Sequence, residues 1–138
     1  MTDKGFTQIE LAVLGKLLDR SDSLSSALRE QVQYCHVKKR ESTDAGFFTE
    51  LDVPRSVVRR ACDAGEKLTL GDVEADIKGL KNGAGFVLFV SNGYLDMLEG
   101  FTYGEPWPEG QISNFKLYHR EPGNSGGSEN TNSTDIGS

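Results

Sequence analysis

The hydrophobic pattern predicts two helices at the start of the chain. Residues 7–10 read Thr-Gln-Ile-Glu, a capping box in which Thr7 and Glu10 bond each other's backbone amides. The apolar positions that follow, up to about Asp19, cover more than a narrow stripe, which predicts a helix packed on a sheet or on a partner. A second, short helix should begin with Asp22 or Ser23 as its N-cap.

Alternating patterns then predict strands. Residues 34–40 lead into a turn at 42–46, and in the return strand 47–53 the odd positions share an apolar face while Phe48, Glu50 and Asp52 share the other. Residues 68–77 form a third strand whose phase changes at Gly71, as a bulge there would cause. Residues 112–119 form the last strand.

The clearest strand pair is a hairpin in residues 86–103. Five apolar residues, Phe86 to Val90, end at Ser-Asn-Gly, which indicates a strand buried on both faces and a type I′ turn or a three-residue bulged loop. In the second strand a regular period of two places Glu99 in an apolar row with Leu95, Met97, Phe101 and Tyr103.

An unpaired buried carboxylate is costly, so the position of Glu99 has three interpretations. A bulge at Gly100 could turn it outward, an Arg or Lys could cap it for structural reasons, or it could lie in a cleft and contact a ligand or partner.

Together these elements predict an α+β fold, with N-terminal helices packed on an antiparallel sheet of about five or six strands. Residues 1–122 should form a single domain. Residues 123–138 are rich in Gly, Ser, Asn and Thr, with Ile136 as their one large apolar residue, and should form a disordered polar tail.

Charge and composition narrow the class of partner. A net charge of −6 argues against nucleic-acid binding and fits a basic protein partner. The sequence has no signal-peptide pattern and no long apolar stretch, so we expect a cytoplasmic protein that does not enter a membrane, with Cys35 and Cys62 reduced. Oligomeric state is left open.

No motif indicates a cofactor or a metal. Cys35, His36 and His119 lack the spacings of zinc modules, and the glycine-rich segment 79–85 lacks the Lys-Ser/Thr ending of a P-loop. We therefore expect no cofactor, no metal site and no established catalytic residue, with Glu99 as the candidate if the protein is an enzyme.

Three groups of residues could form surfaces. An acidic row, Asp72, Glu74 and Asp76, could be a solvated face or could bind a basic partner. The loop with Tyr103, Glu105 and Trp107 could anchor a partner or fold back over the sheet edge. A basic set could be a solvated face or an anion site near Ser42 and Thr43; it comprises Lys38, Lys39, Arg40, Arg55, Arg59 and Arg60.

The segments GDVEADI (71–77), NGAGFVLFV (82–90) and LDMLEGFTYGEPWP (95–108), with TDAGFFT (43–49) upstream, resemble a group of small uncharacterised bacterial proteins. That resemblance covers most of residues 8–119 and implies no activity. In size and charge the chain is also similar to immunity proteins that neutralise bacterial toxins.

The sequence thus favours a non-enzymatic protein-binding module that recognises a basic partner, with Asp72, Glu74, Asp76, Tyr103, Glu105 and Trp107 as contact residues. The alternative is a small enzyme or ligand-binding domain in which Glu99 lies in a cleft beside Tyr103 and Thr43 or His36.

Overall fold

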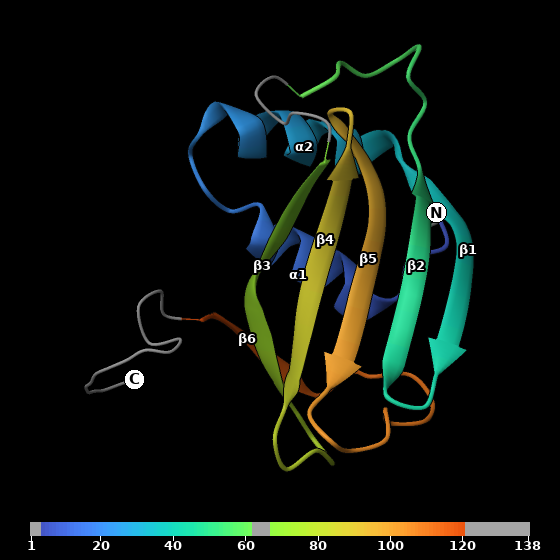
Figure 1. Cartoon of the computed structure of the whole chain (residues 1–138), viewed down its shortest axis with the longest axis vertical. Coiled ribbons are helices and arrows are strands. Elements are labelled where there is room, and N and C mark those ends of the chain that lie inside the picture. Colours follow the sequence, from blue (N-terminus) through green and yellow to red (C-terminus); the bar gives the residue numbers. More distant parts are fainter. Residues whose placement is uncertain (1–3, 62–66, 121–138) are drawn as a thin grey trace.

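A computed structural model of the chain describes residues 4–61 and 67–120 and confirms the α+β fold (Figure 1). Two helices precede a six-stranded antiparallel sheet with the strand order β1-β2-β5-β4-β3-β6. The predicted tail, 123–138, lies outside the described residues. The elements are α1 (Gln8–Leu17), α2 (Ser23–Tyr34), β1 (His36–Thr43), β2 (Gly46–Asp52), β3 (Lys67–Ile77), β4 (Ala84–Ser91), β5 (Tyr94–Thr102) and β6 (Phe115–His119).

Both helices begin at the predicted caps. The Thr7 hydroxyl accepts from the backbone N–H of Glu10, and the Glu10 carboxylate accepts from that of Thr7, which completes the capping box. The Asp22 carboxylate accepts from the backbone N–H of Ser25 at the start of α2, and this bond holds the pKa of Asp22 below its usual range. These local bonds fix the start of each helix.

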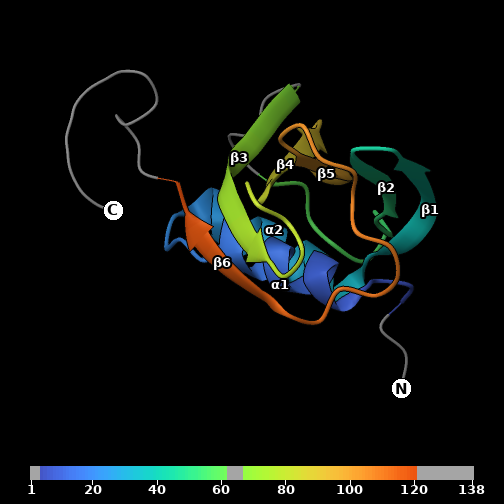
Figure 2. The ribbon, with the colours of Figure 1, turned by 90° about the horizontal axis from the view of Figure 1, so that it is seen from below.

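Both helices cover one face of the sheet, which we call the inner face. Figure 1 shows α1 and α2 behind the strands, and Figure 2 shows the sheet curling around the helices. The core lies between these layers, and Val13 and Leu28 from the helices and Phe86, Leu88 and Leu98 from the sheet are at most 1% exposed. On β2 the predicted face is confirmed, because residues 47, 49, 51 and 53 are all buried.

The hairpin differs from the expectation in one respect. Its turn is type I′, with positive φ at Asn92 (53°) and Gly93 (84°). The preceding strand β4, however, is not buried on both faces. Phe86 points to the helices and is buried, whereas Val87 and Phe89 point the other way and are only half-buried, because no described element covers that face (Figure 1).

Bulges set which residues face the helices. The predicted bulge in β3 is confirmed, since the pairing register shifts between Leu70 and Val73, across Gly71. In β5 the bulge is at Asp96 and not at Gly100, because Leu95 pairs with Val90 and Met97 with Phe89. Leu95 therefore lies on the inner face, while the residues beyond the bulge at 97, 99 and 101 lie on the outer face.

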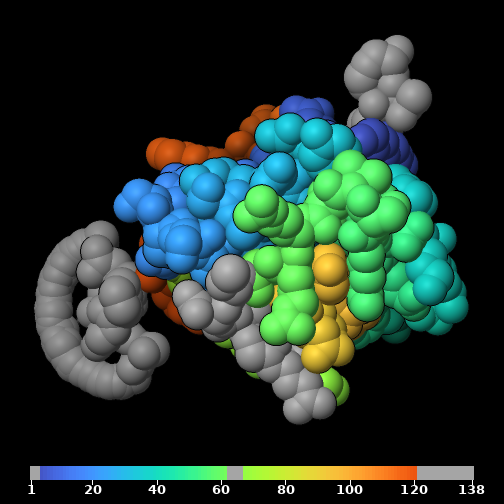
Figure 3. Space-filling view, turned by 90° about the horizontal axis from the view of Figure 1, so that it is seen from above, coloured from blue at the N-terminus to red at the C-terminus, as the bar shows by residue number. Residues whose placement is uncertain are grey.

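The strand order requires the chain to cross the top of the sheet between β2 and β3. Residues 53–61 make this crossing over the β4–β5 turn, as Figure 3 shows from above. Gln31 of α2, fully buried, holds this region together: its side-chain amide donates to the carbonyls of Arg59 and Gly93 (2.9 Å each) and accepts from the N–H of Leu95 (2.9 Å). All of these amide interactions are within the fold, so Gln31 is structural.

At the other end, residues 103–114 connect β5 to β6. The backbone N–H of Trp107 donates to the carbonyl of Asp44 in the β1–β2 turn (2.7 Å), and the connection then crosses α1 to reach β6 (Figure 2). The Trp107 ring packs edge-on against Phe47 (centroids 5.2 Å apart) and Phe86 (6.3 Å). The connection is therefore folded back over the end of the sheet.

Candidate functional site

The outer face of the sheet carries apolar side chains that no described element covers. Pairing registers place Glu50, Met97 and Phe89 in one row across β2, β5 and β4, and Phe48, Glu99 and Val87 in the next. A third row adds Phe101, whose ring lies over Gly85 so closely that a Cβ there would be 2.7 Å from it. We call this surface the outer patch: Phe48, Glu50, Val87, Phe89, Met97, Glu99 and Phe101.

The apolar members of the outer patch are half-buried, and none of them packs against the main core. They cover one another instead, side by side on adjacent strands. Their remaining contact with water makes the outer patch an apolar surface, and large contiguous apolar surfaces often bind other molecules.

Glu99 lies near the middle of the outer patch. Its neighbours across β2 and β4 are Phe48 and Val87, both apolar, and the carboxylate is half-buried. In the described part of the chain neither Glu99 nor Glu50 has a hydrogen-bond or ion-pair partner, although Lys39 is opposite Glu50 in the register. Glu99 also does not line the described pocket. Of the three interpretations of Glu99, the structure shows the outward orientation. The bulge at Asp96, and not one at Gly100, produces it.

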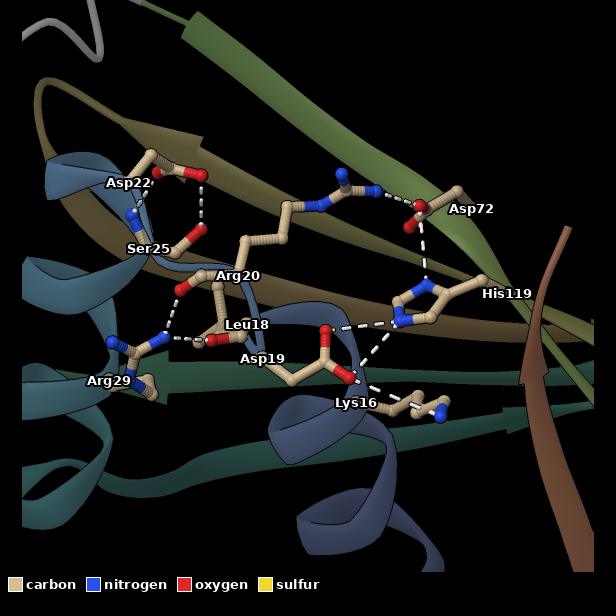
Figure 4. Close-up of polar contacts among 9 residues, drawn as sticks. All are labelled: Lys16, Leu18, Asp19, Arg20, Asp22, Ser25, Arg29, Asp72 and His119. Atoms are coloured by element: carbon tan, nitrogen blue, oxygen red, sulfur yellow. Dashed lines mark hydrogen bonds and ion pairs between the residues drawn. The ribbon is translucent and has the colours of Figure 1, made fainter. Parts of the chain in front are cut away.

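Two of the three residues in the predicted acidic row have partners within the chain. Asp72 forms an ion pair with Arg20, and its carboxylate is 3.3 Å from His119 Nδ1 (Figure 4). The other ring nitrogen of His119 is 3.0 Å from Asp19 Oδ1, so the histidine joins β6 and β3 to the end of α1. Only Asp76 remains exposed and without a described partner.

Glu74, the middle member of the acidic row, is also occupied. It accepts from the Tyr103 hydroxyl (2.8 Å) and pairs with Arg120 (3.2 Å). Burial, and then the bond to Glu74, raises the pKa of Tyr103 to about 12, although the residue is 40% exposed. Tyr103 and Glu74 are thus brought together by an intramolecular hydrogen bond at the surface.

The remaining predicted contact residues have structural partners as well. The Glu105 carboxylate accepts from the backbone N–H groups of Lys81 (3.0 Å) and Asn82 (2.8 Å) and so fixes the β3–β4 connection. These two bonds, that of Lys81 first, hold the pKa of Glu105 below its usual range. Trp107, as described above, packs on Phe47 and Phe86. Of the six predicted contact residues, only Asp76 has no described partner, and their contact with another protein stays a prediction.

The basic set is dispersed. Arg40 donates to the Glu10 carboxylate from Nε (2.8 Å) and Nη2 (2.6 Å), and Arg55 lies over the Tyr94 ring at 4.4 Å. His36 is 3.2 Å from Asp52, both exposed. Thr43, His36 and Glu99 do not converge. Within residues 4–61 and 67–120 no group of three His, Cys, Asp or Glu side chains could hold a metal ion.

Sequence reasoning missed a pocket of about 460 Å³ on the inner side of the sheet, between the start of α1, the β1–β2 turn and residues 106–112. Glu10 lies at its base and is 1% exposed. Its carboxylate accepts four bonds, from the Thr7 N–H, the Thr49 hydroxyl (2.6 Å) and twice from Arg40. The capping-box pattern revealed Glu10 as a cap but gave no sign of the bonds to Arg40 and Thr49.

Neither helix in the described part of the chain combines the length and the apolar character needed to cross a membrane. Comparisons with protein-family models, with curated proteins and with solved structures found no match for this chain.

Proposed function

We propose that the protein is a binding module that uses the outer patch to bind another protein, and that the contact region of that partner is apolar and basic. The observation that carries this proposal is Glu99, a half-buried carboxylate between Phe48 and Val87 on a sheet face with no described cover. The argument has an apolar part and an electrostatic part.

The apolar part concerns area. Half-buried Phe, Met and Val side chains lose their remaining contact with water when a partner covers them, and aromatic anchors at the centre of an interface provide much of the binding free energy. Such a surface needs a partner with apolar side chains.

The electrostatic part concerns charge. A partner over the outer patch would remove water from Glu99, and a desolvated carboxylate without a countercharge is strongly unfavourable. A second copy of this chain, packed face to face about a two-fold axis through the patch, would bring like carboxylates together. A partner with Lys or Arg at this point satisfies Glu99 instead.

The same geometry weakens the enzyme alternative. A general acid or base acts on a substrate held in a concave site, whereas Glu99 lies on the outer face of the sheet and does not line the pocket beside Glu10. The contact surface proposed here therefore keeps the basic partner expected from the sequence but moves its position from the acidic row of β3 to the centre of the sheet.

A displayed library of random peptides, selected on the full chain, tests the proposal. The enriched peptides should combine aromatic or aliphatic residues with Lys or Arg. Their affinity, measured by fluorescence polarisation, should fall at least about tenfold in a Val87→Arg variant, since a long cation at the centre of the patch blocks contact. The control is Val57→Arg, the same change at a position that is 61% exposed and outside the patch.

Charge is tested separately. Glu99→Gln keeps the shape of the side chain, so it should lower the affinity for basic peptides and leave the unfolding midpoint unchanged. The control is Asp96→Asn, a change at an exposed position on the same strand, which should have little effect on that affinity. Enrichment of acidic peptides, or equal affinities for Val87→Arg and Val57→Arg, would refute the proposed surface.

A further inference from the structure

The pocket at the start of α1 is separate from the outer patch, because it opens on the helix side of the sheet. Its volume, about 460 Å³, is within the range of sites that hold small organic molecules, roughly 300–1,000 Å³. Two connections that are distant in sequence form its walls, the β1–β2 turn and residues 106–112, and the bond from Trp107 N–H to Asp44 holds them together.

One part of the pocket is apolar and firmly held. Phe47, Trp107 and Ile112 line it, and the Trp107 ring is fixed by edge-on contacts with Phe47 and Phe86. A ring held in this way can pack against the hydrocarbon part of a ligand without a large loss of side-chain freedom. The body of the ligand should therefore be apolar.

The charges around the pocket are unbalanced. At the base, Glu10 and Arg40 neutralise each other, and all four bonds that the Glu10 carboxylate accepts are from the protein. At the mouth, Asp44 and Glu109 are exposed carboxylates without a partner among residues 4–61 and 67–120. The hydroxyls of Ser42 and Thr43 add acceptors nearby. An anion would be repelled here, and a cation attracted.

From this combination we infer that the pocket binds a small organic ammonium ion, with its apolar body against Trp107 and its charged group toward Asp44 and Glu109. A primary ammonium has three N–H donors, which can be shared between the two carboxylates and one of the two hydroxyls. The inference does not depend on the proposed function, since none of these residues belongs to the outer patch.

Trp107 is the single tryptophan of the chain and provides a native reporter. Its fluorescence should change in a saturable way when the full protein is titrated with 2-phenylethylamine. The matched probe, 3-phenylpropanoate, has a similar body and the opposite charge, and should give no saturable change over the same concentration range. A response to both probes, or to neither, would overturn the inference.

A pair of double variants tests the role of the mouth. Asp44→Asn with Glu109→Gln should weaken the affinity for the amine about three- to tenfold, as expected for two exposed carboxylates that each attract the cation modestly. Asp76→Asn with Asp96→Asn removes the same total charge from exposed positions outside the pocket and should leave the affinity unchanged. Equal affinities for the two double variants would show that the mouth carboxylates do not bind the amine.

Discussion

Replacement of Arg40 by Met should destabilise the protein more than the same replacement of an exposed lysine of β1, because Arg40 is the countercharge of the buried Glu10 carboxylate. The Glu10 side chain is 2% exposed, and two of the four bonds that it accepts are from Arg40. In Arg40→Met the carboxylate keeps the Thr7 N–H and the Thr49 hydroxyl but has no cation beside it.

The magnitude follows from burial. Removal of one member of a fully buried ion pair costs about 3–5 kcal/mol. Arg40 is 32% exposed, so water can reach part of the space that its side chain leaves, and we expect about 2–3 kcal/mol for Arg40→Met. Glu10→Gln should cost about 1–2 kcal/mol, since the neutral amide needs no countercharge and the exposed guanidinium is hydrated. The double variant should cost at least about 1 kcal/mol less than the sum of the two.

Urea unfolding at neutral pH measures all three variants, with Lys39→Met as the control on the same strand. Lys39 is exposed and has no described ion-pair partner, so its loss should change the free energy of unfolding by no more than about 0.5 kcal/mol. Equal costs for Arg40→Met and Lys39→Met, or costs for Glu10 and Arg40 that add within about 0.5 kcal/mol, would refute the idea that this pair is coupled.

Three further measurements test the fold and the titrating groups. Phe86→Ala should cost about 3–5 kcal/mol in urea melts and Phe89→Ala clearly less, because only Phe86 is enclosed by the core; equal costs would mean that the outer face is covered. The pKa of Glu105 is lower in the folded protein than in the unfolded chain, so its contribution to stability is present above the unfolded pKa and is lost as pH falls through the folded pKa. Glu105→Gln should therefore reduce the loss of stability on acidification below about pH 5. An unchanged pH profile would contradict this. Burial raises the pKa of the Cys35 thiol to about 11. In a Cys62→Ser background this thiol should therefore react with a disulfide reagent at pH 8 far more slowly in the folded protein than in urea. Equal rates would show that Cys35 is accessible.

The parts of the fold that local chemistry determines could be predicted from the sequence. Thr7 and Glu10 cap a helix by bonds within one turn, and Asn92-Gly93 adopt the positive φ values that a type I′ turn requires. The bulge at Gly71 was indicated by a phase change in the apolar pattern. Each of these signals lies within a few residues of the feature that it predicts.

Features that depend on which strands become neighbours could not be predicted in this way. The bulge at Asp96 is a mismatch between β5 and β4, and a period-two reading of β5 alone gives no sign of it. The prediction that β4 is buried on both faces was wrong, because an apolar run does not reveal whether a second layer covers the sheet. Glu10 and Arg40 are thirty residues apart and meet only once α1 has docked on the inner face of the sheet.

The strand order has a consequence for how the chain folds. Strands β3, β4 and β5 follow one another and pair as a meander, so their contacts close short loops and form at little entropic cost. The β1–β2 hairpin must then find the free edge of β5, although Glu50 and its partner Met97 are far apart along the chain. We therefore expect a transition state built around the meander, in which changes at the Asn92-Gly93 turn slow refolding, whereas changes between β2 and β5 mainly accelerate unfolding.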